Sequence, residues 1–137
     1  MIYLDSAALV KLVRVEDETG ELVRWLNERP DQRLVASALV EVEVPRALRR
    51  SQPGVLRAVA GVLARIDRIE IGAAIRATAA AYVEPNLRSL DAVHLATADE
   101  LRAAGKPVSA LVTYDVRLAD AARAAAFTVV APGRVAR

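Results

Sequence analysis

The sequence predicts an α/β protein in which helices cover both faces of a central parallel sheet. Short apolar segments that suit buried strands alternate along the chain with helical segments of about 10 to 15 residues. Parallel neighbours in a sheet need such helical crossovers, which then lie on its two faces. The chain has 137 residues, 54% of them hydrophobic, which suffices for one core. We therefore expect one domain spanning residues 1–137, with a loose tail over its last few residues.

The expected elements follow one another in a regular order. Strands are predicted at residues 1–4, 33–36, 68–71, 110–114 and 127–130. Helices are predicted at residues 7–13, around the apolar stripe 22–26, and at 38–50, 55–66, 73–82, 90–104 and 115–126.

Several helix ends carry recognisable signals. Ser37 and Ser89 are each expected to cap the helix that follows, and Gly105 suits the end of the second of these. Pro45 lies inside the predicted helix 38–50. Because an interior proline costs a regular helix about 3 kcal/mol, we expect either a kink or a late helix start there.

The composition excludes several classes of site. There is no cysteine and only one histidine, His94, so disulfides, thiolate zinc sites and multi-histidine metal sites are excluded. Any metal must therefore be held mainly by oxygen. The net charge of +2 says little about nucleic acid, although all but two of the 19 basic residues are Arg. No membrane span or cleavable leader is visible, and we expect a cytoplasmic protein.

Several carboxylates lie where a predicted strand ends or a predicted helix begins. Asp5 and Asp115 each follow a predicted strand, and Asp91 begins a helix whose N-terminus can point to the same edge of the sheet. Each one alone could be a simple helix cap. A cluster of carboxylates would repel itself unless a cation neutralised it, and an all-oxygen ligand set suits Mg²⁺ or Mn²⁺. Such sites activate water for phosphodiester hydrolysis.

A fourth carboxylate is expected from the helix after Ser37, which offers Glu41 and Glu43. The two side chains lie about 200° apart around a helix, so only one of them can face the site. Hydrophobic periodicity does not decide between them.

Four sequence blocks, in this order, resemble the PIN-domain ribonucleases, and most of all the VapC-type toxins of prokaryotic toxin–antitoxin pairs. The blocks are Leu4-Asp-Ser-Ala7, the segment from Ser37 to Leu48, the segment from Ser89 to Ala98, and Leu111-Val-Thr-Tyr-Asp115. Each block alone is weak, whereas the ordered set covers nearly the whole chain.

The resemblance implies a three-layer α/β/α sandwich and a Mg²⁺- or Mn²⁺-dependent endoribonuclease acting on RNA. It also implies a homodimer bound by a cognate antitoxin. It assigns the metal and catalytic site to Asp5, Glu43, Asp91 and Asp115, and favours Glu43 over Glu41. Ser6 stands at the family's Thr or Ser beside the first Asp, and Thr113 is expected to support Asp115.

Other polar residues are weaker candidates for the site. Asp99 lies two turns beyond Asp91 and is expected to be solvated, and His94 is expected to be a buried structural histidine on the helix face away from the acids. Arg14, Arg46 and Arg117 are loose candidates for binding flanking phosphates, with exposed surface as the simpler explanation.

Two rival functions use a similar fold. A receiver-like phosphoryl-transfer domain would need a partner Lys after a late strand or a second Asp beside the first, and neither is present. A catalytically inactive PIN-like domain that only binds RNA or protein would not need all four acids, which are intact here.

Overall fold

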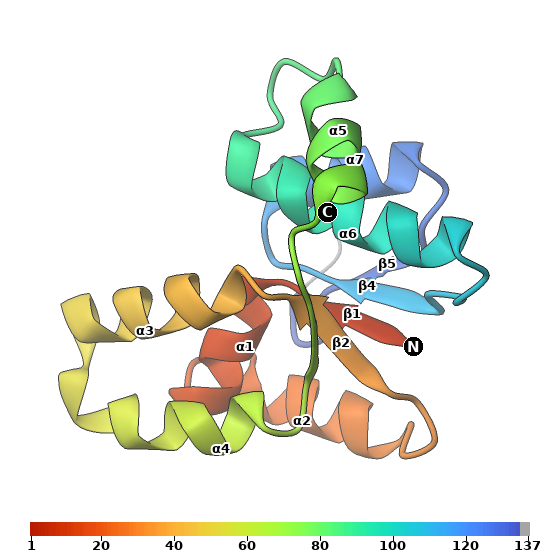
Figure 1. Ribbon diagram of the computed structural model, residues 1–137. Coiled ribbons are helices and arrows are strands. Elements are labelled where there is room, and N and C mark those ends of the chain that lie inside the picture. Colours follow the sequence, from red (N-terminus) through yellow and green to blue (C-terminus); the bar gives the residue numbers. More distant parts are fainter. Residues whose placement is uncertain (135–137) are drawn as a thin grey trace.

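A computed structural model describes residues 1–134 of the protein (Figure 1). Residues 135–137, part of the expected tail, lie outside the described residues. Five strands form one parallel sheet in the order β3-β2-β1-β4-β5. The strands are β1 (Ile2–Leu4), β2 (Leu34–Ser37), β3 (Asp67–Ile69), β4 (Ala110–Val112) and β5 (Val129–Val130).

Helices cover both faces of this sheet, as predicted. The helices are α1 (Ser6–Val13), α2 (Thr19–Asn27), α3 (Val40–Ser51), η1 (Pro53–Ala58, a 3₁₀ helix), α4 (Val59–Leu63), α5 (Ala73–Ala81), α6 (Ser89–Ala103) and α7 (Val116–Ala124). Figure 1 shows α1 to α4 on one side of the strands and α5 to α7 on the other. In residues 1–134 no helix is both long and apolar enough to cross a membrane.

The alternation of side chains along β1 divides the core between these layers. Ile2 and Leu4 belong to a buried cluster with residues of α1, α3 and α4, whereas Tyr3 belongs to a second cluster with residues of α6 and α7. Successive strand residues point to opposite faces, so a fully buried central strand supplies both clusters. The prediction of a parallel sheet sandwiched between helices is therefore confirmed.

Sheet topology also fixes where a ligand can approach. From β1 the chain crosses to β2 on one side, and β4 later pairs with β1 on the other side. The order of strands reverses at β1, and in open parallel sheets the crevice outside the carboxyl ends at such a point is the usual ligand site. The segments that leave β1 and β4, which begin with Asp5 and Thr113, meet there.

Four predictions about helix bounds and caps were wrong. The predicted helix 55–66 divides into η1 and the short α4, because apolar spacing over two turns does not separate 3.0 from 3.6 residues per turn. The helix expected from residue 38 begins at Val40, because the N–H of Ala38 still donates to the Ile69 carbonyl of β3. The start of α3 at Val40 leaves Pro45 inside the helix, so the alternative of a start late enough to keep Pro45 out of the helix interior was wrong.

The third error concerns Ser89, which is the first residue of α6 and not its cap. Arg88 holds the capping position, its carbonyl accepts from the N–H of Ala92 at 2.8 Å, and no side chain caps the helix. Ser37 likewise ends β2, although its hydroxyl does accept from the N–H of Leu39 at 3.1 Å.

Candidate active site

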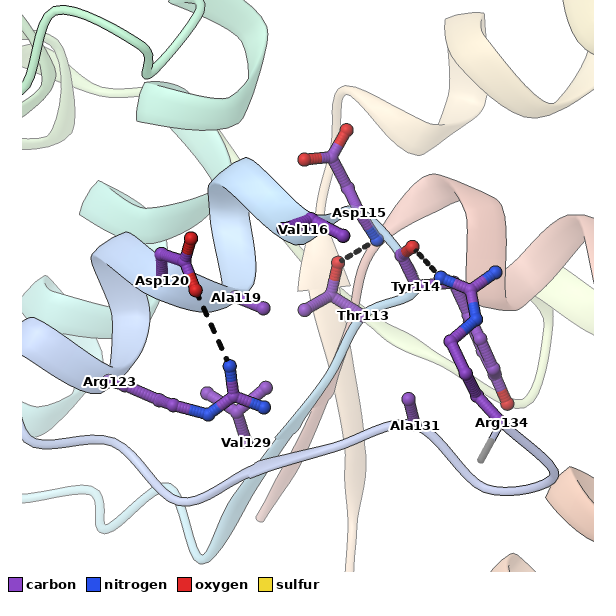
Figure 2. A pocket seen from close by; sticks show the side chains of 10 residues that line it. All are labelled: Thr113, Tyr114, Asp115, Val116, Ala119, Asp120, Arg123, Val129, Ala131 and Arg134. Carbon is purple, nitrogen blue, oxygen red and sulfur yellow. Dashed lines mark hydrogen bonds and ion pairs between the residues drawn. The ribbon is translucent and has the colours of Figure 1, made fainter. Parts of the chain in front are cut away.

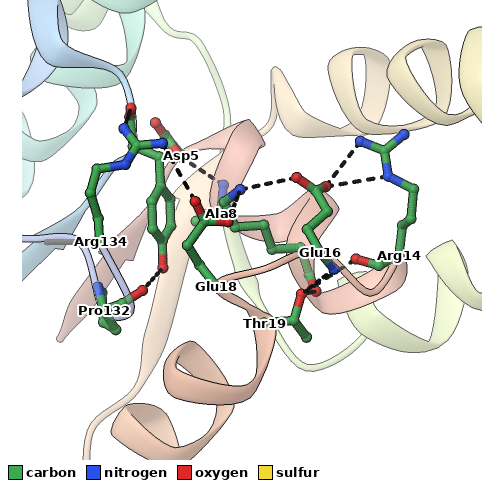
Figure 3. Close-up of polar contacts among 10 residues, drawn as sticks. Asp5, Ala8, Arg14, Glu16, Glu18, Thr19, Pro132 and Arg134 are labelled. Atoms are coloured by element: carbon green, nitrogen blue, oxygen red, sulfur yellow. Dashed lines mark hydrogen bonds and ion pairs between the residues drawn. The ribbon is translucent and has the colours of Figure 1, made fainter.

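Asp5 and Asp115 leave the carboxyl ends of β1 and β4 and are tied to each other through Thr113. One Asp5 oxygen accepts from the backbone N–H of Ala8 at 2.9 Å (Figure 3), and the other accepts from the hydroxyl of Thr113 at 2.5 Å. The same hydroxyl accepts from the backbone N–H of Asp115 at 3.1 Å (Figure 2). Thr113 supports Asp115 as expected, through its backbone, and in addition orients Asp5.

Both acids also cap helices, so the simple interpretation of each carboxylate is correct as well. Asp5 caps α1, and Asp115 caps α7 by accepting from the N–H of Leu118 at 3.0 Å. In each case one oxygen is used by the cap. The cap fixes the direction of each carboxylate. The second oxygen accepts from the Thr113 hydroxyl in Asp5 and pairs with Arg88 at 3.2 Å in Asp115.

The Asp5 carboxyl is unusual in its burial. It is 4% exposed, and burial raises its pKa, an effect opposed by His94, Thr113 and the N–H of Ala8 and reinforced by the Asp115 charge. A buried carboxylate is stable in its ionised form only when nearby groups compensate for lost water. A nearby cation would therefore stabilise the ionised form of Asp5.

Glu43, and not Glu41, faces this region. From α3, Oε1 of Glu43 accepts a hydrogen bond from the hydroxyl of Ser6 and lies 2.9 Å from Nε2 of His94. Burial alone would raise the pKa of Glu43, but the His94 and Ser6 hydrogen bonds outweigh it and leave the pKa below its usual value. Glu41 turns outward to an ion pair with Arg68 at 3.5 Å.

His94 is buried, as predicted, but the expectation that it faces away from the acids was wrong. An ionised carboxylate can only accept, so Nε2 donates to Glu43, and Nδ1 then accepts from the Tyr3 hydroxyl at 2.7 Å. Burial raises the pKa of Tyr3, so this hydroxyl keeps its proton to donate. A buried chain from Tyr3 through His94 therefore orients Glu43.

Asp91 completes the set from the first turn of α6. Its Oδ2 is buried and, among residues 1–134, has no hydrogen-bond partner. Burial raises the pKa of Asp91, and the nearby Asp115 charge adds to this increase. The nearest cation is Arg88, whose Nε lies 3.5 Å from Oδ2 of Asp91 and whose Nη2 lies 3.2 Å from Oδ2 of Asp115.

The structure thus brings all four predicted acids to one edge of the sheet. Thr113 joins Asp5 to Asp115, and Arg88 joins Asp115 to Asp91. Glu43 is joined to the neighbour of Asp5 through Ser6, and to α6 through His94.

Asp99 lies outside this cluster. Instead of being merely solvated, it accepts a hydrogen bond from the Tyr82 hydroxyl and forms an ion pair with Arg102 at 2.7 Å. Of the three arginines suggested from the sequence, Arg46 and Arg117 are exposed, and Arg14 pairs with Glu16 at 2.9 Å. The basic residue that reaches the acids is Arg88, which had no sequence signal beyond its place before the Ser89 block.

A cavity of about 460 Å³ opens beside Asp115 (Figure 2). Two arginines border it: Arg123 pairs with Asp120 at 3.6 Å, and Arg134 donates to the carbonyl of Tyr114. The cavity is large enough for a part of a substrate that reaches Asp115. Its lining carries two arginines, which can bind phosphate groups, and two acids, Asp115 and Asp120.

A buried lysine of α1 supports the site from below. Lys11 of α1 is 6% exposed, pairs with Glu16 and Glu18 at 3.0 Å each, and lies over the Tyr114 ring. Figure 3 shows these two glutamates and Arg134 on the side of α1 next to Asp5. These contacts hold the last turn of α1 against Tyr114, which follows β4.

The donor chemistry of the acidic cluster fits a hard divalent cation, because every donor is a carboxylate oxygen and one buried oxygen, Oδ2 of Asp91, has no hydrogen-bond partner among residues 1–134. The side chains do not yet form a closed cage. In the described part of the chain, no three or more Asp, Glu, His or Cys side chains are placed so that they could hold a metal ion as they stand.

Comparisons with known proteins agree with this architecture. The PIN-domain family model matches residues 2–124. Ribonuclease VapC35 of Mycobacterium tuberculosis is 56% identical to this chain over 134 residues, 98% of each protein.

Two solved structures share the fold at low identity. The M. tuberculosis toxin VapC20, described as cleaving the sarcin-ricin loop, matches with a TM-score of 0.73 and 20% identity, over 96% of this chain and 100% of that one. A toxin–antitoxin complex from Klebsiella pneumoniae matches with a TM-score of 0.65 and 22% identity, over 84% and 87% of the two chains. With a family model over most of its length and a close relative over nearly all of it, this protein belongs to the PIN-domain family and, within it, to the VapC-type proteins.

Proposed function

We propose that this protein is an endoribonuclease that hydrolyses RNA phosphodiester bonds with Mg²⁺ or Mn²⁺ and acts as the toxin of a toxin–antitoxin pair. The observation that carries the chemistry is the gathering of Asp5, Glu43, Asp91 and Asp115 at the carboxyl edge of β1 and β4. One buried Asp91 oxygen there receives no hydrogen bond from the part of the chain that the structure describes. The 56% identity to a ribonuclease supports RNA as the substrate.

Each acid has a distinct part in this proposal. The four carboxylates would hold the divalent ion, which when bound supplies Lewis-acid activation of water and neutralises charge that develops on the phosphate. Asp5 and Asp115 are aimed by their helix caps and by Thr113. Glu43 is aimed by Ser6 and His94, which both use Oε1 and so leave Oε2 for the crevice.

The direct test is an RNA cleavage assay with the purified chain. We expect cleavage with MgCl₂ or MnCl₂, none with EDTA, and a loss of at least about 100-fold in Asp5→Asn and Asp115→Asn. Glu41→Gln and Asp99→Asn are matched controls, because these acids lie on the same helices α3 and α6 and point elsewhere. They are expected to cleave like the wild type.

Two outcomes would contradict parts of this proposal. Cleavage that persists in EDTA would refute the metal dependence. A correctly folded wild-type chain that binds RNA without cleaving it in either metal would favour the rival interpretation, a PIN-like domain that only binds.

The partner is proposed to be a cognate antitoxin, with the toxin itself a homodimer. The toxin–antitoxin complex among the structural neighbours supports this, together with the VapC-type relative. Expression of the chain alone should arrest growth, and expression with the gene next to it should relieve the arrest and yield a complex. Light scattering of the purified chain should give twice the 14.7 kDa chain mass. Unimpaired growth, or a monomer, would contradict the respective statement.

A further inference from the structure

Arg88 reaches into the acidic cluster from the surface. Its side chain is 64% exposed, against 16% for Asp91 and 27% for Asp115, and its guanidinium contacts one oxygen of each acid. It immediately precedes α6, where the backbone is extended (φ −77°, ψ 160°). A long, exposed side chain at a helix start can leave its contacts without disturbing the fold.

The contact with Asp91 is incomplete. Nε of Arg88 stands 3.5 Å from Oδ2 of Asp91, close enough for an ion pair, yet this buried oxygen has no hydrogen bond from the described residues. A buried acceptor without a donor loses the full free energy of its hydration. A small cation that contacted both carboxylates directly would satisfy this oxygen, which the guanidinium does not.

The same contacts explain why the acids do not form a closed metal cage as they stand. The Oδ2 atoms of Asp91 and Asp115 both face the guanidinium, so the space between these two acids is occupied. Divalent ions such as Mg²⁺ bind carboxylate oxygens at about 2.0 to 2.1 Å. The guanidinium and such an ion cannot contact the same two oxygens at once.

We propose that Arg88 is an internal counter-ion of the acidic site, which the divalent ion displaces. In the ion-free protein the guanidinium balances the charges of Asp91 and Asp115, and on ion binding it leaves both. This inference rests on the proposed function, because it assumes that the ion binds among these acids.

The first test measures Mn²⁺ binding to the wild type and to Arg88→Gln by isothermal titration calorimetry. Without the competing guanidinium, we expect Arg88→Gln to bind Mn²⁺ about three- to tenfold more tightly, a modest gain because partly exposed ion pairs are weak. Arg24→Gln is the matched control. Arg24 is 66% exposed and forms an ion pair three residues away with Glu21, as Arg88 does with Asp91, but it lies on α2.

A second test separates displacement from a general effect of removing positive charge. The Nε–H signals of the wild-type arginines are followed by NMR during titration with Mg²⁺, and the Arg88 signal is identified by its absence in Arg88→Gln. Displacement predicts that the Arg88 signal shifts until the site is saturated, whereas the Arg24 signal does not. Because the titration is performed on the wild type, the test remains valid even if Arg88→Gln is less stable.

The outcomes distinguish this inference from the function on which it rests. Equal Mn²⁺ affinity in the wild type and Arg88→Gln would overturn the inference and leave the metal site intact. An Arg88 Nε–H signal that does not shift at saturating Mg²⁺ would do the same. No Mn²⁺ binding by either protein would overturn both the inference and the metal dependence.

Discussion

Removing the Tyr3 hydroxyl should weaken both the fold and the site, although Tyr3 touches none of the four acids. Tyr3→Phe keeps the ring in the core and deletes the hydroxyl that bonds Nδ1 of His94, 2.7 Å away, and that also interacts with Ser37 and Thr97. Tyr3 is fully buried and His94 is 3% exposed, so water cannot replace the lost bond. A buried acceptor left without its donor costs about 1 to 2 kcal/mol.

That loss should be visible in both stability and activity. In urea unfolding followed by circular dichroism, the free energy of unfolding should fall by about 1 to 2 kcal/mol, with a melting temperature lower by roughly 5 °C. Residues that hydrogen-bond to a metal-ligating side chain and orient it contribute about 10- to 100-fold to metal affinity or activity. Tyr3 acts in this way on Glu43, through His94. We therefore expect RNA cleavage to fall by about tenfold, the lower end of that range.

Tyr82→Phe is the control for this prediction. It also removes a tyrosine hydroxyl hydrogen bond, but this one joins Tyr82, which directly follows α5, to Asp99, which lies two turns beyond Asp91 on α6. It should keep full activity whatever its effect on stability. The reasoning would be refuted if Tyr3→Phe unfolded at the wild-type urea concentration, or if it cleaved RNA as fast as the wild type.

Three further predictions concern the support of the site and the core. Thr113→Val keeps the shape of the side chain but leaves a buried Asp5 oxygen without its donor, so calorimetry should show a loss of about 1 to 3 kcal/mol and the cleavage assay a clear loss of rate. The Lys11 hydrogen bond lowers the pKa of Glu18 below 4.5, so its stabilisation is present above that pH and is lost as the pH falls through the folded value. In urea titrations from pH 6 to pH 3, Lys11→Met should therefore be less stable than the wild type at pH 6 and lose less stability on acidification. Leu95→Ala empties a fully packed position between α6 and the sheet and should cost about 2 to 5 kcal/mol in the same titrations, without altering the site carboxylates.

The layered architecture could be predicted because its signals are local. Every strand except β3 (Asp-Arg-Ile) is a short, mainly apolar run, the crossovers have helical spacing, and the order of elements then requires a parallel sheet. Asp5 and Asp115 were found for the same reason, since a carboxylate between a strand and a helix is visible in the sequence. Errors at element ends arose where tertiary contacts decide, as at Ala38, which bonds to β3 and delays α3.

The rest of the site depends on where α3 lies relative to Ser6 of α1 and His94 of α6, which no local pattern encodes. Hydrophobic spacing left Glu41 and Glu43 undecided, and only the packing of α3 beside Ser6 and His94 separates them. His94 was assigned to the wrong face for the same reason. Arg88 was missed because an exposed arginine before a helix has no distinctive pattern, and its meaning comes from two acids that lie 3 and 27 residues further along the chain.

The central claim is that the four acids form a divalent metal site, and the most direct test is anomalous diffraction from crystals soaked in Mn²⁺. We predict a peak between Asp5, Asp91 and Asp115, within about 2.5 Å of carboxylate oxygens, with Glu43 reaching it directly or through water. No peak among these acids at saturating Mn²⁺, in a protein that still cleaves RNA, would contradict the account.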